Sequence, residues 1–280
     1  MLDDNTINSM YNKCKNLVTK KDYKNAREAI KELIDAVEPL YISPLKKYYS
    51  FNHILDSYYY SYFFKDTEEL NYAMHNINDY YRLYGFIFMH LERYDEASVA
   101  YNKALLYNPV DVDTYFQLGE LYKKTGNIRG VKKISFEVYN YCCSRATMAH
   151  FYRNLGYYYL ENYKPETALA LYIYSNIFYE TKQALSEIDF LKSTVPSLND
   201  THIFSLKKDI KKLQSILEEN NIPTGPNPDT IGITYRVGQL EMQALNYENA
   251  CDCFTLVYDL TLDKDVEKDL ICCKEHLQQN

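Results

Sequence analysis

A pattern of aromatic residues, glycine and small residues recurs along this chain at a 34-residue period and constrains its fold most strongly. In the clearest copy, from Asn78 to Asp111, Gly85 lowers helix propensity by about 1 kcal/mol, which indicates that a second helix approaches closely there. Pro109 lacks an amide hydrogen and therefore ends the second helix. The pattern predicts stacked pairs of helices. Its positions are held by Tyr81, Tyr84, Gly85, Phe88, Tyr94, Ala97, Tyr101, Ala104 and Pro109.

Three weaker copies, and a degenerate one around Tyr23 and Ala26, follow the same spacing. In the second copy Ser135 replaces an aromatic residue, and in the last Glu241 does. The pattern resembles the tetratricopeptide repeat, in which two helices pack through these positions. The resemblance implies an all-α fold, a right-handed α-solenoid of antiparallel helix pairs that forms a superhelix. The three weaker copies run over 112–145, 149–182 and 231–264.

The spacing of the copies predicts a division of the chain into five segments. Outside the copies, the stretches 44–76 and 182–220 have helical apolar spacing and are predicted to continue the stack as altered helix pairs. Lys207 and its neighbours are predicted on a solvated helix face opposite Ile203, Leu206, Ile210, Leu213 and Leu217. The predicted segments are degenerate N-terminal repeats (1–77), three repeats (78–182), divergent helices (183–220), an irregular link (221–230) and a C-terminal repeat with a capping helix (231–280).

Charge and cysteine content restrict the partners and the compartment. The formal net charge is -7 and the pI is about 5.5, which argues against nucleic acid, since phosphate binding relies on a basic face. The start of the chain lacks the pattern of a secretion signal, and no run approaches the roughly 20 apolar residues of a membrane span. Seven cysteines, an odd number, do not form the pattern of a secreted disulfide framework. We therefore predict a cytoplasmic protein without membrane or nucleic-acid contacts.

Motifs for catalysis, cofactors or metals are not found in the sequence. The six histidines form no zinc-protease motif, and neither a phosphate-binding glycine loop nor a nucleophile elbow is present. The best metal candidates are Cys251, Cys253, Cys272, Cys273 and His276, but Cys251 and Cys253 point to different sides of a helix. Buried free cysteine is the preferred interpretation. The sequence predicts a protein that is not an enzyme and has no cofactor or metal.

The resemblance also nominates residues for ligand binding. In the family, the first helices of successive repeats line a concave groove, and fixed positions point into it. Aromatic groove residues would anchor a peptide, and Arg82 and Arg153 would meet its acidic groups. Phe86 and Glu120 stand where a carboxylate-binding clamp would need small polar groups, which argues against that subtype. The candidates are Asp79, Arg82, Phe86, Met89, Asp113, Phe116, Glu120, Lys123, His150, Arg153, Tyr157, Leu160, Tyr235, Gln239 and Met242.

Two hypotheses for function follow from this sequence. The first is a scaffold that binds a protein or peptide in the groove of the repeats. The second is a structural subunit that self-associates into a homo-oligomer through its repeat faces or its last helix. Peptide binding by a monomer favours the first, and a dimer that buries the concave face favours the second.

Overall fold

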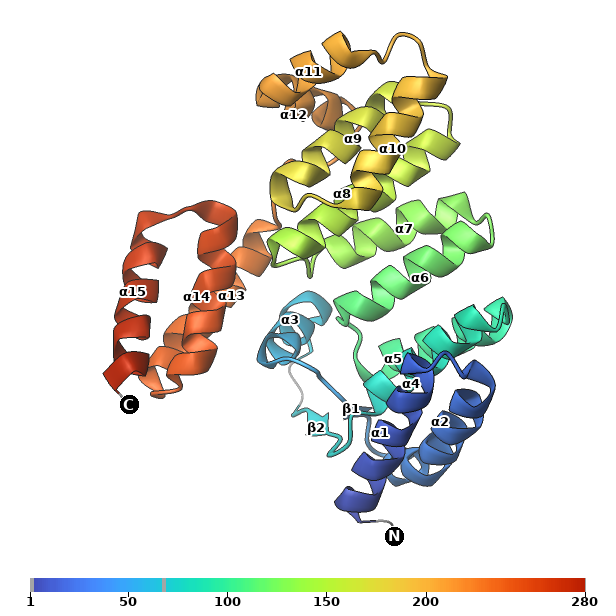
Figure 1. Cartoon of the computed structure of the whole chain (residues 1–280). Helices are drawn as coiled ribbons and strands as arrows, with labels where there is room; N and C mark the ends of the chain where they lie inside the picture. The colour runs from blue at the N-terminus through green and yellow to red at the C-terminus, as the bar shows by residue number, and fades with distance from the viewer. Residues whose placement is uncertain (1–2, 67–68, 280) are drawn as a thin grey trace. The chain divides into compact units, whose positions relative to one another are not determined.

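The computed structural model describes residues 3–66 and 69–279 (Figure 1). The ends of the predicted segments 1–77 and 231–280, and residues 67–68, include positions outside these described residues. The structure divides into two compact units, Met1–Gly126 and Asn127–Asn280. In both, consecutive helices pack against each other as pairs, which confirms the all-α class and the construction from helix pairs.

The first unit contains consecutive packed helices and an insertion, residues 44–76, that separates α2 from α4 in the sequence. Helix α1 packs on α2, α2 packs on α4, and α4 packs on α5, so the order along the chain is largely the order of contact. Its elements are α1 (Asp4–Thr19), α2 (Tyr23–Val37), the 3-10 helix η1 (Glu38–Tyr41), β1 (Tyr48–Tyr49), α3 (Ile54–Phe64), β2 (Asn71–Tyr72), α4 (Ile77–His90), α5 (Tyr94–Tyr107) and α6 (Val112–Lys124).

The second unit is helical in all its regular elements that the structure describes. Helix α8 pairs with α9, and α13 pairs with α14, which in turn packs on α15. The last pair begins at Pro228, three residues before the repeat predicted from Ile231. The elements are α7 (Ile128–Tyr139), α8 (Arg145–Glu161), α9 (Pro165–Phe178), α10 (Lys182–Thr194), α11 (Asp200–Lys208), α12 (Ile210–Glu219), α13 (Pro228–Gln243), α14 (Tyr247–Thr261) and α15 (Lys264–Gln279).

A glycine of the first helix faces an aromatic ring of the second helix in the pairs α4–α5, α8–α9 and α13–α14. A Cβ atom added at any of these glycines would lie less than 3.0 Å from the ring. The helices therefore approach as closely as the glycines in the sequence predict. The contacts join Gly85 to Tyr101, Gly156 to Tyr172 and Gly238 to Phe254.

Five of the turns between consecutive helices share one backbone conformation. The residue two positions before the start of the following helix has a positive φ, between 57 and 68°. Only one of these residues is glycine, although the left-handed region costs other residues roughly 1–2 kcal/mol. The repeated turn therefore overrides local preference at each of these positions. They are Lys21, Glu92, Gly126, Tyr163 and Leu245.

The stretch 44–76 differs from the helix pair predicted for it. Its described residues form one α-helix, α3, between strands β1 and β2, which pair in parallel with Tyr48 opposite Asn71. The sequence of α3 is apolar on all sides, so it provides no single face along which a second helix would pack. Lys65, in the left-handed conformation with φ 53°, ends the helix.

The stretch 182–220 also departs from one helix pair, because it forms the three helices α10, α11 and α12. The break falls at Asp209, whose side chain accepts a hydrogen bond from the backbone N–H of Lys212 at 3.0 Å and so caps α12. Ile210 directly follows this break and is 47% exposed, so its predicted place on the buried face is wrong. The four lysines of the predicted solvated face are exposed: Lys207, Lys208, Lys211 and Lys212.

Candidate functional site

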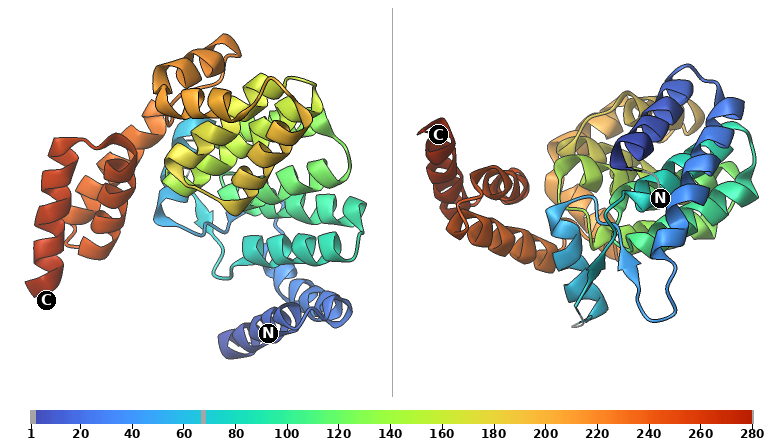
Figure 2. Two further views of the ribbon diagram at one scale, coloured as in Figure 1. Left: turned by 45° about the horizontal axis from the view of Figure 1, so that its top comes forward. Right: turned by 90° about the horizontal axis from the view of Figure 1, so that it is seen from below.

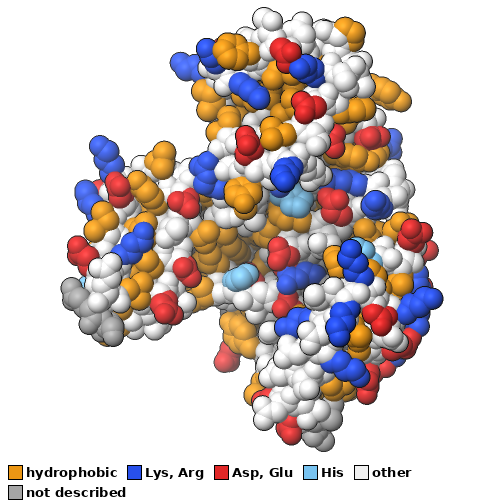
Figure 3. Space-filling view, in the orientation of Figure 1, with side chains coloured by type: hydrophobic (Ala, Val, Ile, Leu, Met, Phe, Trp, Pro, Cys, Tyr) orange, Lys and Arg blue, Asp and Glu red, His pale blue; other side chains and the backbone are white. Residues whose placement is uncertain are grey.

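The candidate groove residues lie on the first helices of the pairs, in separate sets on the two units. In the first unit they lie on α4 and α6, which contact each other. In the second unit they lie on α8 and α13. Because these helices hold their small and aromatic packing residues against their partners, the remaining faces are free to carry polar side chains. On the face of the molecule that Figure 3 draws, cationic and acidic side chains are interspersed.

Arg82 is held by three carboxylates at the center of the first set. Its Nη2 donates to Asp79 Oδ1 at 2.5 Å, and its Nη1 lies 3.0 Å from Asp111 Oδ1 and 3.3 Å from Asp113 Oδ2. Burial alone would lower the pKa of Arg82, but the carboxylates outweigh it and raise that pKa. Burial raises the pKa of Asp79, against the effect of Arg82. The cluster keeps two carboxylates in excess and therefore favours a cationic ligand group over an acidic one.

A buried polar network continues from this cluster into the insertion. Asp111, 6% exposed on its side chain, also accepts from Asn78 Nδ2 at 3.2 Å and from the hydroxyl of Thr114. Asn78 Oδ1 accepts from Asn52 Nδ2 at 2.7 Å, which connects α4 to the residues before α3. Helical spacing does not predict this network, since Asn78 and Asp111 lie at the two limits of a repeat and outside its apolar packing positions.

A second buried carboxylate anchors the start of α3. Asp56 accepts from Asn108 Nδ2 at 2.7 Å and from the backbone N–H groups of Asn52 and His53. Burial raises the pKa of Asp56, and the hydrogen bond from Asn108 opposes that rise. The insertion is therefore tied by polar groups to the end of α5, where Asn108 lies.

The other candidates of the first unit differ in exposure. Phe86 and Met89 are half-buried on α4, and the ring of Phe86 lies 4.5 Å from that of His90. Phe116 is buried, only 6% exposed, whereas the sequence placed it in the groove. Glu120 and Lys123, on the same helix, form an ion pair at 2.7 Å. Phe86 and Met89 thus provide accessible apolar surface on α4 beside the Arg82 cluster.

The candidates of the second unit form two groups. His150, Arg153 and Tyr157 are half-buried on α8, and their spacing places them on one helix face. On α13, the Tyr235 hydroxyl donates to Asp269 Oδ2 of α15 at 2.6 Å, a bond that raises the pKa of Tyr235. Gln239 accepts from Arg236 at 3.2 Å.

A small pocket lies beside Gln239, between α13, α14 and α15. Its volume is about 250 Å³, which suits one side chain. Arg236 and Asp269 give it one charge of each sign, and Phe254 and Met242 contribute apolar walls. The full lining is Arg236, Gln239, Met242, Gln243, Phe254, Asp269 and Cys272.

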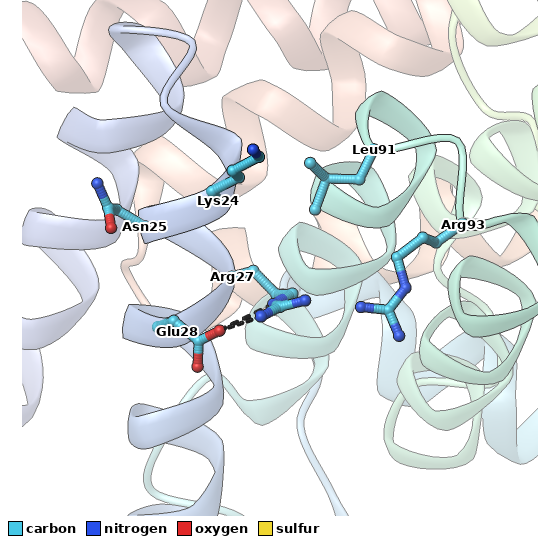
Figure 4. A pocket seen from close by; sticks show the side chains of 6 residues that line it. All are labelled: Lys24, Asn25, Arg27, Glu28, Leu91 and Arg93. Carbon is cyan, nitrogen blue, oxygen red and sulfur yellow. Dashed lines mark hydrogen bonds and ion pairs between the residues drawn. The ribbon is translucent and has the colours of Figure 1, made fainter.

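A larger pocket in the first unit, of about 480 Å³, lies between α2 and the turn from α4 to α5 (Figure 4). Arg27 is paired with Glu28, and Arg93 Nε donates to Glu96 at 2.8 Å. Lys24 is the lining cation with no ion pair among the described residues. The lining residues are Lys24, Asn25, Arg27, Glu28, Leu91 and Arg93.

The cysteines and histidines do not assemble a metal site in the part of the chain that the structure describes. Cys251, Cys253 and Cys273 are buried and Cys272 is exposed. Burial raises the pKa of the Cys273 thiol to about 11 and that of Cys253 to about 12, which keeps both protonated.

Among the described helices, none combines the length and hydropathy that a membrane span needs.

Comparison with known proteins identifies one repeat directly. Residues 85–126, from the middle of α4 to the end of α6, match the family described as TPR repeat, the tetratricopeptide repeat. A crystal structure of a tetratricopeptide repeat protein from Parabacteroides merdae aligns with 96% of this chain and 99% of its own chain, at 13% identity and a TM-score of 0.43. No match to the sequence is found among curated proteins.

Proposed function

We propose that this chain, in which residues 85–126 match the tetratricopeptide repeat, acts as a non-catalytic module that binds an extended segment of a partner protein. Such repeats are generally protein-interaction scaffolds. The proposed binding face of the first unit is formed by α4 with α6. The candidates on α8 and α13 form a separate candidate surface of the second unit.

The observation that carries the proposal is the Arg82 cluster with its apolar neighbours. Asp79 and Asp113 remain partly exposed, with side chains 21% and 69% accessible, while Arg82 is engaged by them and by Asp111. The excess carboxylate charge attracts a lysine or arginine, and Phe86 supplies an apolar surface beside it. We therefore propose a partner segment with a basic residue next to an apolar one, in place of the acidic segment expected from Arg82 in the sequence.

Peptides selected from a random library against the whole chain test this proposal. We expect basic residues to be enriched, and we expect Asp113→Asn to weaken the best peptide about fivefold, since one carboxylate near the bound cation is lost. Phe86→Ala is expected to weaken binding about tenfold through the loss of apolar contact. Isothermal titration at low and high salt measures both effects.

The matched control is Asp95→Asn, which removes an exposed carboxylate of α5 outside the proposed face. It should bind the selected peptide as the unchanged chain does. Equal affinity in Asp113→Asn and Asp95→Asn, or a selection that enriches acidic peptides, would contradict the proposed face.

Self-association through the C-terminal helix is the second candidate function. Helix α15 leaves Ile271 52% exposed and Leu277 37% exposed, which is apolar surface available to a second copy. On this proposal, Ile271→Asp shifts the chain from dimer to monomer because it places a charge in the interface. Light scattering across a range of protein concentrations measures the mass, and a chain that is monomeric throughout contradicts self-association.

A further inference from the structure

The link segment, residues 220–227 between α12 and α13, has no regular structure but is held by three tyrosine side chains. Each tyrosine hydroxyl donates to one of three consecutive backbone carbonyls of the link. The bonds run from Tyr152 to Pro223 at 2.9 Å, from Tyr174 to Thr224 at 2.6 Å and from Tyr139 to Gly225 at 3.0 Å.

The three tyrosines come from three different helices and are well placed as donors. Tyr139 lies at the end of α7, Tyr152 on α8 and Tyr174 on α9. Burial raises the pKa of each hydroxyl, so each keeps its proton. Ile222 of the link is also buried, at 2% exposure. Aromatic side chains that line a binding surface are also used to recognise proline-containing segments in peptide complexes.

Helices α13, α14 and α15 have a hydrophobic core of their own. The buried cluster extends from Ala250 on α14 to Cys273 on α15, and its partly buried neighbours on α13 include Ile231 and Tyr235. Both views of Figure 2 show these helices as a bundle joined through the link to the rest of the unit. Their folding therefore relies mainly on contacts within the bundle.

Beyond the three tyrosine bonds, polar contacts of the link and the bundle with the rest of the unit gather near Asn140. The hydroxyl of Thr230 donates to the Asn140 carbonyl, and Asn227 Nδ2 donates to Asn140 Oδ1 at 2.9 Å. Arg145 Nη1 reaches the Asp259 carbonyl at 3.4 Å in an exposed position. Helix α14 also packs on α8, so the tyrosine-held link and these contacts together attach the bundle to the rest of the unit.

We propose that the link segment is a releasable strap. While the hydroxyls of Tyr139, Tyr152 and Tyr174 hold it, the bundle α13–α15 stays docked on α7–α12; when they release it, the bundle detaches as a folded block. This device goes beyond the proposed ligand binding and does not depend on it. For a ligand that contacts both α8 and α13, the strap sets the distance between the candidate residues on these two helices.

Hydrogen exchange of the whole chain, followed by mass spectrometry, tests the strap. Tyr152→Phe with Tyr174→Phe keeps both rings and removes two of the three donors. We expect the amides of residues 224–231 to exchange about tenfold faster, while α8, α9 and α14 keep their rates. Tyr139 is half-buried. Tyr139→Phe alone is expected to make the same amides exchange about fivefold faster, and this variant tests the strap if the double variant folds poorly.

The matched control is Tyr258→Phe, which removes a hydroxyl that donates to Glu267 at 2.9 Å inside the bundle. Its link amides should exchange as in the unchanged chain. Link exchange that is unchanged in the tyrosine variants overturns the strap. A parallel rise in α8 and α9 also overturns it, because the tyrosines would then hold the helix pair and not the link.

Discussion

Gly85→Ala is expected to lower the free energy of unfolding by about 2 kcal/mol, although alanine is the better helix former. The new Cβ atom would lie 2.4 Å from Cε1 of Tyr101 and 2.6 Å from its Cδ1. That ring is fully buried, so it has no space into which to withdraw and α4 must move away from α5. The overpacking outweighs the gain in helix propensity, which is about 1 kcal/mol. Urea unfolding followed by helical circular dichroism measures the change.

Two glycines of α13 provide the matched comparison. The Cβ atom of Gly232→Ala has no neighbour within 4 Å, so this change is expected to raise the free energy of unfolding by about 0.5–1 kcal/mol. The Cβ atom of Gly238→Ala would lie 2.8 Å from Phe254, so that change is expected to lower the free energy of unfolding. The double variant Gly85→Ala with Tyr101→Leu should lose less free energy of unfolding than the sum of the losses in the two single variants, because the smaller leucine side chain relieves the clash. A stabilising effect of Gly85→Ala would contradict the close approach of the helices.

The helix pairs could be predicted from the sequence because each pair forms its contacts within one repeat. Gly85 and Tyr101, or Gly156 and Tyr172, belong to the same 34-residue pattern, so a local period carries the information. The left-handed residue in each turn escaped prediction because four of the five are not glycine. There the repeat geometry overrides the preference of the single residue.

The insertion and the polar contacts could not be predicted in the same way. Helix α3 has apolar residues on all sides, and its attachment depends on Asp56 meeting Asn108, far along the chain. Apolar spacing reports which side chains are buried, but not which hydrogen bonds a buried hydroxyl or carboxylate makes. For that reason the sequence predicts Arg82 to meet acidic groups of a ligand and does not reveal its contacts with three carboxylates of this chain.

Asp111→Ala is expected to lower the free energy of unfolding by about 3–5 kcal/mol, the largest effect of any single change considered. The carboxylate is 6% exposed and accepts from Arg82 at 3.0 and 3.1 Å, from Asn78 at 3.2 Å and from the Thr114 hydroxyl. Alanine leaves the fully buried Asn78 amide and the partly buried guanidinium of Arg82 without this acceptor. Removing one partner of a buried charge pair is costly because the other charge stays desolvated.

The control for this change is Asp113→Ala, which removes a carboxylate that contacts the same guanidinium. Asp113 lies 3.3 Å from Arg82 Nη1 but is 69% exposed, so water replaces its contact and the expected loss is below about 1 kcal/mol. Urea unfolding of both variants, measured side by side, separates burial from charge. Equal losses in the two variants would contradict the network, because the effect would then follow the number of carboxylates near Arg82 and not the buried hydrogen bonds of Asp111.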